Sequence, residues 1–415
     1  MFGVRWAAIA GKAGYALGCL AASLAMVASG FAYYVKSQVD SIGGSSVISG
    51  GPSVGAMNIL LMGLESRTYW SGQPLPRGLE DVMHIGSVGG DATNTLILLH
   101  IFAGGQKAVG FSIPRDDWVT MYGTGGYGGA QGKIDQAYGF ALANKENQLA
   151  GAHLSQVALA QAGNEAGRLA EIQTVEALTG VHIDHFAELN LDGFYQLAQV
   201  FGGIEVCLNE ATSDANSGAN FTAGYHHLDA AQALAFVRQR DNLPNGDLDR
   251  THRQQAVVDY VIWKLRTQGV LTDLGELTGL LSIAKHYLIT DHGWNLLDFL
   301  SEMKNLSGKN LTFTTLPIVG YQTIDSQDAN VVNTSYIKQV VRQTFYPAPA
   351  PAPVTPSGQR AAAAPPDGAA TFAATTPAAP SPPASPALNP ADNNGANGAA
   401  VVVKPSAPYG IPCVD

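Results

Sequence analysis

The chain has 415 residues and a formal net charge of −10; 46% of its residues are hydrophobic and only 13% are charged. An acidic, charge-poor chain lacks the basic surface with which non-specific nucleic-acid-binding proteins neutralise phosphates, so we expect no nucleic-acid partner. The three cysteines are too few for a disulfide-dense scaffold, and none has the Cys-x-x-Cys or Cys/His spacing that is typical of a zinc site.

The first apolar segment, residues 13–35, contains no charged residue and is flanked by Lys12 and Lys36. A helix of this length spans a hydrocarbon core of about 30 Å. Because Arg5 and Lys12 precede it, the positive-inside rule places residues 1–12 in the cytoplasm and the rest of a single-pass protein outside the cell membrane. A cleaved signal peptide is the alternative, but no Ala-x-Ala motif stands at the end of the segment, which favours an uncleaved anchor.

Residues 36–56 are rich in Gly and Ser and predict a linker, and the globular domain is expected over residues 57–346. Within this domain, short apolar runs bounded by turn residues predict strands, and helical patterns lie between them. The alternation predicts an α/β fold, in the form of an α/β/α sandwich around a mixed central β-sheet. Strands are predicted at residues 59–62, 96–102, 108–113, 204–208 and 311–318, and helices at residues 135–147, 152–179, 191–201, 230–237, 249–266, 273–287 and 294–305.

Residues 347–409 are predicted to be a Pro/Ala-rich low-complexity tail, because such a composition cannot bury a core. Residues 410–415 return to apolar side chains and predict a short segment docked on the domain. Since Cys19 lies in the apolar segment, Cys207 and Cys413 are the two cysteines outside the membrane, where disulfides persist, and we predict a bond between them. A buried free Cys207 with a separate thiol at Cys413 is the alternative.

Arginines are unevenly placed in this charge-poor chain. Arg238, Arg240, Arg250 and Arg253 fall within a short stretch that contains the turn Pro-Asn-Gly and a new helix start near Asp247 or Asp249. Several guanidinium groups on both sides of a tight turn can converge on one anion with many oxygens, such as a phosphate or pyrophosphate. A solvated face with local Arg–Asp pairs is the alternative.

Other charged side chains stand at the ends of predicted strands. Arg115 and Asp116 follow the strand that Pro114 ends, where α/β sheets place their ligand sites. Glu65 follows the first strand and Asp91 precedes the second. Oxygen ligands of this kind suit a hard cation such as Mg²⁺.

These motifs, in this order, resemble the LytR–CpsA–Psr family of cell-envelope phosphotransferases. The resemblance rests on SIPRD at residues 112–116, on the Lys-Ile-x-x-Ala-Tyr element at residues 133–138, and on longer blocks at residues 178–206 and 226–255. It implies transfer of a glycopolymer from a polyprenyl-pyrophosphate carrier to peptidoglycan, with formation of a phosphodiester. The sequences of these motifs are similar to those of mycobacterial-type members, and this similarity implies that the polymer is arabinogalactan-like. A polyprenyl-pyrophosphate hydrolase and a non-catalytic lipid-carrier-binding or envelope regulatory protein are the alternatives.

The resemblance also implies roles for individual residues. Asp116 would be either the general base or a brace for Arg115, and the helices within residues 152–201 and 273–305 would offer apolar surface for the polyprenyl chain. The residues implied to bind the pyrophosphate are Arg115, Arg238, Arg240 and Gln254, assisted by Lys133 and Arg250, with Arg253 placed in the same substrate-binding set.

A metal, Mg²⁺ or Mn²⁺, is implied at Glu65, Asp91 and Asn94. Many family members have Asp at the position of Glu65 and Ser-Asp-Thr where this chain has Thr93, Asn94 and Thr95. Because Asn94 is a neutral ligand, we predict weak metal binding, carried by Glu65 and Asp91 rather than by Asn94.

Overall fold

The computed structural model describes residues 32–40, 42–66, 91–127, 129–267, 274–303, 310–347 and 413–415, together with the single residues 29, 73 and 306. The predicted cytoplasmic residues 1–12, most of the predicted anchor and nearly all of the predicted tail lie outside this part of the chain. Residues 32–39 are helical. Among the described residues, no helix is both long and apolar enough to cross a membrane.

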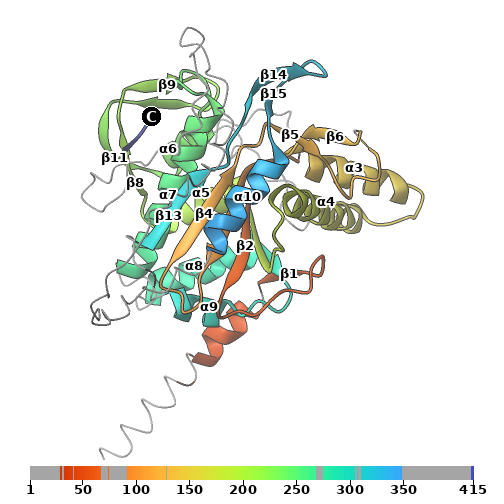
Figure 1. Cartoon of the computed structure of the whole chain (residues 1–415). Coiled ribbons are helices and arrows are strands. Elements are labelled where there is room, and N and C mark those ends of the chain that lie inside the picture. The colour runs from red at the N-terminus through yellow and green to blue at the C-terminus, as the bar shows by residue number, and fades with distance from the viewer. Residues whose placement is uncertain are drawn as a thin grey trace, which may run out of the picture.

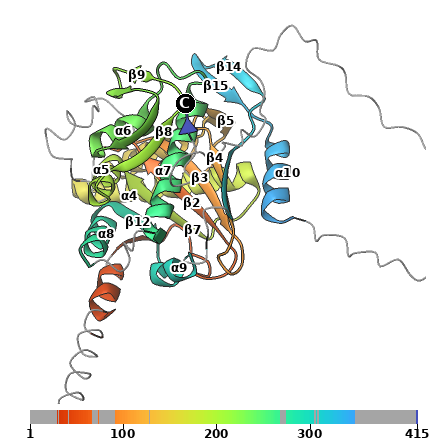
Figure 2. The same ribbon diagram turned by 90° about the vertical axis from the view of Figure 1, so that its left-hand side faces the viewer.

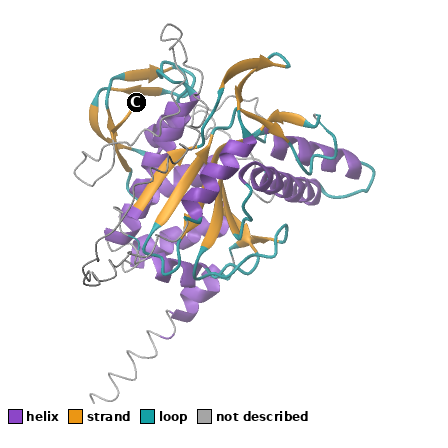
Figure 3. Cartoon of the chain, viewed as in Figure 1, coloured by secondary structure: helices purple, strands orange, loops and turns teal. Residues whose placement is uncertain are grey.

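A seven-stranded mixed sheet forms the centre of the molecule (Figures 1 and 3), as the sequence predicted. The inner strands pair parallel between β2 and β7 and antiparallel between β2 and β3 and between β3 and β4. The order across the sheet is β1 (Gly43–Ser45), β12 (Leu288–Asp291), β7 (His185–Asn190), β2 (Met57–Leu64), β3 (Thr93–Ile101), β4 (Ala108–Ile113) and β13 (Leu311–Thr315).

The side chains of β2 reach both faces of the sheet, because successive side chains of a strand point to opposite faces. Leu60 and Met62 pack in a core with Ile172 of α4 (Gln156–Thr179) and Val341 of α10 (Thr334–Phe345). Leu61 lies between them in sequence and faces the other side of the sheet, where it lines a cavity. One face of the sheet is therefore a closed core, and the other face forms the wall of the candidate site.

Helices on the second face complete the sandwich. Figure 2 shows α10 on one side of the sheet and α5 and α8 on the other. All seven predicted helices are present, within a few residues of their expected ends, although α4 packs on the closed face and offers no surface to the cavity. The remaining helices are α3 (Gln136–Leu149), α5 (Leu191–Val200), α6 (Ala230–Arg238), α7 (Asp247–Thr267), α8 (Leu274–Tyr287) and α9 (Leu296–Met303).

A second, smaller sheet packs on α6 and α7. It has the order β11 (Gly224–Leu228), β8 (Ile204–Leu208) and β16 (Cys413–Val414), so the strand predicted at residues 204–208 exists but lies outside the central sheet. Phe236, Val257 and Val414 share its core. Cys207 and Cys413 form the predicted disulfide. The docked segment thus joins the small sheet as a third strand.

Several strands escaped the sequence prediction, and β7 did so because part of its buried face is polar. In β7, His185 is bonded to Asp291 and Glu188 is bonded to Arg168, and all four side chains are buried. No apolar run marks such a strand. The other missed strands include β1, which lies within the predicted linker, β12 and β11, together with β9 (Thr212–Asp214), β10 (Ala219–Phe221) and the four-stranded sheet of β14 (Gly320–Ile324), β15 (Gln327–Val331), β5 (Asp117–Thr120) and β6 (Gln131–Lys133).

Candidate active site

A cavity of ≈ 980 Å³ lies between the second face of the central sheet and helices α5 to α9. Its volume is at the upper end of the roughly 300–1,000 Å³ that small-molecule pockets occupy. Val39 and Ile42, which follow the predicted anchor, contribute to its wall. The apolar lining includes Leu61, Ile97, Leu99, Phe194, Leu197, Phe201, Val257, Val261, Leu277, Leu280, Ile283, Trp294 and Phe299.

Arginines line the polar part of the same cavity. Arg115 is there at the end of β4, and the turn between α6 and α7 brings in side chains from both helices. The structure therefore brings together five of the residues predicted to bind a pyrophosphate: Arg115, Arg238, Arg240, Arg250 and Gln254.

Local hydrogen bonds fix the turn that carries these arginines. The main-chain N–H of Arg240 donates to Asp214 Oδ2 at 3.1 Å. The main-chain N–H of Asn245 donates to Asp249 Oδ2 at 2.7 Å, so Asp249 closes the first turn of α7 as a cap would. Polar residues of the turn thereby hold the two helix ends at the cavity.

Three carboxylates surround the inner edge of Arg115. Its Nε lies 3.7 Å from Asp116 Oδ2, 4.0 Å from Asp135 Oδ2 and 3.5 Å from Asp247 Oδ1, and its side chain is 11% exposed. The sequence singled out Asp247 as a possible helix start and as a possible local partner of the arginines, and it did not single out Asp135. Their position beside an arginine depends on the three-dimensional packing of β4, the β6–α3 junction and α7.

Asp116 and Lys133 lie behind the arginines rather than in the cavity wall. Lys133 Nζ donates to Asp116 Oδ1 at 2.7 Å. Burial acts to raise the pKa of Asp116, but Arg115, Lys133 and Arg240 together hold that pKa below its ordinary value. An ionised carboxylate between cations is a weak proton acceptor, so the geometry favours Asp116 as the brace of Arg115 rather than as the general base.

Asp135 has the opposite electrostatic character. Burial raises its pKa to about 6, against the opposing effect of Arg115. Its Oδ1 is buried and has no hydrogen-bond partner. Asp135 is therefore protonated in part of the population in mildly acidic solution.

The arginines repel one another in the absence of an anion. Burial, together with repulsion from Arg115 and Arg240, lowers the pKa of Arg250 to about 10 against the opposing effect of Asp247. Arg250 still carries its charge at neutral pH. A phosphate group that enters this part of the cavity relieves the repulsion, because it accepts several charge-assisted hydrogen bonds at once.

The residues predicted to hold a metal are arranged differently from expectation. Asn94 Nδ2 donates to Glu65 Oε2, and Arg115 NH1 donates to Asn94 Oδ1. Asp91 does not line the cavity and instead acts electrostatically on Tyr138 and on Glu146 of α3. The described part of the chain contains no group of three His, Cys, Asp or Glu side chains placed to hold a metal.

One carboxylate and one amide oxygen, the latter bound by a guanidinium, do not provide the oxygen-rich ligand set that Mg²⁺ takes. The residues present therefore do not fit a metal held by the protein itself. The main chain of Asp91 lies against α3, with its carbonyl oxygen 3.0 Å from where a Cβ of Gly139 would stand. Metal binding by Asp91 stays a prediction.

Arg253 is a second correction. Its side chain is fully buried outside the cavity, with its guanidinium 4.8 Å from the centre of the Phe236 ring. Arg253 Nε donates to the main-chain oxygen of Asp415 at 2.6 Å, and NH1 donates to Gln239 Oε1 at 2.7 Å. Three residues after Arg250, it turns toward the small sheet, whereas Gln254 stays at the cavity wall.

The fold and the cavity together define a class: an α/β protein with a cavity that combines a largely apolar wall with a cluster of arginines, which suits an amphiphile with a phosphorylated headgroup. Residues 28–345 match the model of the LytR_cpsA_psr family, and the chain belongs to this family.

Relatives with assigned names agree with this membership. The cell wall biosynthesis protein LcpA of Corynebacterium glutamicum is 33% identical over 318 residues, which cover 74% of this chain and 60% of LcpA. This chain thus spans about three fifths of that relative. The polyisoprenyl-teichoic acid–peptidoglycan teichoic acid transferase TagU of Oceanobacillus iheyensis is 29% identical over 286 residues, which cover 69% of this chain and 74% of TagU.

Solved structures share the fold. Protein gbs0355 of Streptococcus agalactiae superposes with a TM-score of 0.52 at 21% identity and covers 70% of this chain and 88% of its own. TagV of B. subtilis superposes with a TM-score of 0.50 at 18% identity and covers 71% of this chain and 99% of its own. At these identities the likeness concerns the architecture alone.

Proposed function

We propose that the protein is a phosphotransferase that moves a glycopolymer from a polyprenyl-pyrophosphate carrier to peptidoglycan and forms a phosphodiester. One observation carries the proposal: a single cavity joins an extended apolar wall to a group of four arginines. An apolar chain and a pyrophosphate are the two parts of one such substrate. The names of the relatives, a cell wall biosynthesis protein and a teichoic acid–peptidoglycan transferase, support the same class of reaction.

In this proposal the polyprenyl chain occupies the apolar wall formed by α5, α7, α8 and the sheet. Burial of its methylene groups provides binding energy of about 0.8 kcal/mol per group. Residues 13–35 would anchor the protein in the membrane with the domain outside. Val39 and Ile42, directly after that segment, line the cavity, which would place one of its openings close to the bilayer.

The pyrophosphate would bind at Arg115, Arg238, Arg240 and Arg250. A muramic acid 6-hydroxyl attacks the phosphorus on the glycan side, and the bond from that phosphorus to the bridging oxygen breaks. Polyprenyl phosphate leaves with that oxygen and takes up the proton that the hydroxyl loses. Negative charge develops on the leaving phosphate, and arginines fixed beforehand stabilise it. Asp116 and Lys133 hold Arg115 in place for this purpose.

The glycopolymer is proposed to be arabinogalactan-like. This finer assignment rests on the mycobacterial-type sequences of the motifs and on the similarity to a corynebacterial cell wall biosynthesis protein. Transfer assays that offer arabinogalactan and teichoic acid precursors in separate reactions test it directly. A higher rate with the teichoic acid precursor contradicts the assignment.

The full-length protein in detergent, supplied with a polyprenyl-pyrophosphate-linked glycan and peptidoglycan, separates the three candidate functions. A transferase releases polyprenyl phosphate and links glycan to peptidoglycan in equal amounts. A hydrolase releases the lipid phosphate without linking glycan. A carrier-binding or regulatory protein retains the intact lipid, which mass spectrometry of the purified protein detects.

A further inference from the structure

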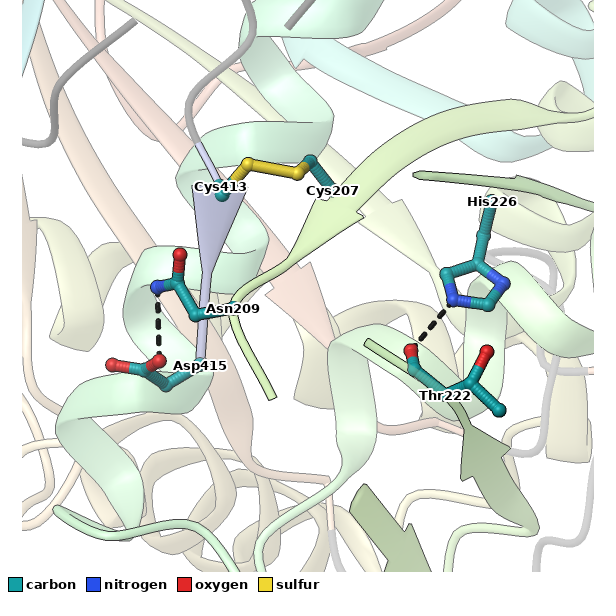
Figure 4. Close-up of a disulfide and its surroundings, with 6 residues drawn as sticks. All are labelled: Cys207, Asn209, Thr222, His226, Cys413 and Asp415. Atoms are coloured by element: carbon teal, nitrogen blue, oxygen red, sulfur yellow. Dashed lines mark hydrogen bonds between the residues drawn. A yellow bond between two sulfur atoms is a disulfide. The ribbon is translucent and has the colours of Figure 1, made fainter. Parts of the chain in front are cut away.

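The segment Cys413–Asp415 is fastened to the small sheet at three points. Cys413 is disulfide-bonded to Cys207, and the main-chain N–H of Asn209 donates to the Val414 carbonyl at 2.9 Å. Asn209 Nδ2 also donates to Asp415 Oδ1 at 2.9 Å (Figure 4). Val414 is 3% exposed in the core beneath this sheet. These contacts bring the main chain of Asp415 to α7.

Arg253 connects this segment to the turn between α6 and α7. Its Nε donates to the main-chain oxygen of Asp415, and its NH1 donates to Gln239 Oε1. Burial lowers the pKa of Arg253 to about 10, with Asp249 and Asp415 opposing the effect, so the side chain remains charged at neutral pH. The buried Arg253 guanidinium therefore connects the main chain of Asp415 to the side chain of Gln239.

Gln239 lies between two arginines of the cavity, Arg238 and Arg240, and its side chain is fully buried. Its Oε1 accepts from Arg253, and its Nε2 donates to Thr212 Oγ1 and, at 3.0 Å, to the main-chain oxygen of Asp241. The Gln239 amide therefore links the main chain of Asp241, which follows Arg240, to Thr212 of β9. Asn216 Nδ2 also donates to Asp241 Oδ2 at 2.7 Å, and Asn242 Nδ2 donates to the Ser213 carbonyl at 2.8 Å, so Gln239 acts together with these bonds to hold the turn.

We propose that Arg253 and Gln239 are positioning residues through which the disulfide-bonded segment Cys413–Asp415 holds Arg238 and Arg240 in their pyrophosphate-binding orientation. The inference rests on the proposed function of those arginines. Loss of either partner leaves a buried donor or acceptor unpaired, and the turn relieves this by moving. Reduction of the Cys207–Cys413 bond weakens the same support from its outer end, which makes headgroup binding sensitive to thiol reductants.

Two short isoprenoid probes separate positioning from simple stabilisation. Geranylgeranyl pyrophosphate carries both the apolar chain and the charged head, whereas geranylgeraniol carries the apolar chain alone. We define the head preference as the ratio of their affinities for the full-length protein in detergent, measured by calorimetry. A positioning defect lowers this ratio, while a general loss of fold lowers both affinities together.

We expect Gln239→Leu to lower the head preference about tenfold and to leave geranylgeraniol binding unchanged. Arg253→Lys keeps the charge and one donor group, so its ratio should lie between those of Gln239→Leu and the wild type. Cys413→Ser, or treatment of the wild type with a thiol reductant, should also lower the ratio. His226→Ala is the matched control, because His226 lies on the same small sheet and bonds to the Thr222 carbonyl rather than to Arg253 or Gln239 (Figure 4).

The outcomes distinguish this inference from the function on which it rests. If the wild type prefers the pyrophosphate, Arg240→Ala abolishes the preference, and Gln239→Leu, Arg253→Lys and Cys413→Ser all retain it, the positioning role is wrong and the function stands. A wild type without any head preference overturns both. A parallel fall in both affinities in the three variants shows that the segment only stabilises the domain, which also refutes the inference.

Discussion

Replacement of Arg240 by alanine isolates the arginine cluster from the stability of the fold. The Arg240 side chain is 49% exposed, and its guanidinium lies 3.8 Å from Asp116. A partly exposed ion pair of this kind contributes about 0–1 kcal/mol to stability. The Arg240→Ala protein should therefore unfold within a few degrees of the wild type.

The cost to binding is larger. A charge-assisted hydrogen bond to a phosphate oxygen contributes about 1.5–3 kcal/mol, which corresponds to roughly a 10- to 150-fold loss of activity at 25 °C. The assay is transfer of glycan to peptidoglycan by the full-length protein, with circular dichroism melting as the measure of folding. Arg342→Ala is the matched control, because Arg342 is an exposed arginine on α10, on the closed side of the sheet. A folded Arg240→Ala protein with the activity of the Arg342→Ala control would refute the assignment of the cluster.

Two further predictions concern the charges around Arg115. Asn94→Asp places a second carboxylate beside Glu65, so calorimetry should detect Mg²⁺ binding by this variant that the wild type, whose residues do not fit the ion, does not show. A variant that binds Mg²⁺ no better than the wild type would mean that Asn94 is not at a metal position. Burial raises the pKa of Asp135 to about 6, so the native state loses stability as pH rises from about 4 to about 6, relative to a chain without this carboxyl. The stability of Asp135→Asn relative to the wild type should therefore increase over that interval and stay constant above it, and a pH-independent difference in melting temperature would contradict this pKa.

The sequence predicted the parts of the fold whose signals are local. β2, β3 and β4 are buried on both faces and read as nearly continuous apolar runs, which is how such strands are recognised. β7 was missed because His185 and Glu188 are buried with partners that lie 106 and 20 residues away in sequence. When a strand is buried through polar contacts with residues that are distant in sequence, its own sequence does not indicate that it is buried.

The candidate site shows the same division. The cavity arginines were predictable because charges are rare in this chain and these four stand at element ends. Arg253 was assigned wrongly because sequence spacing places it near Arg250 but does not say which helix face meets the small sheet. The predicted disulfide bears on this assignment. The segment bonded to Cys207 covers part of α7, and Arg253 is the side chain that it covers.

The arrangement of Arg115 explains how carboxylates can coexist with a site for anions. Its Nε edge faces Asp116, Asp135 and Asp247, which offset the repulsion among the arginines when no ligand is bound. Its NH1 instead meets the neutral amide of Asn94 in the cavity wall. A carboxylate at that position would compete with phosphate for the same guanidinium. The neutral Asn94 therefore leaves the outer end of Arg115 electrostatically available to an anion, such as the pyrophosphate proposed as its ligand.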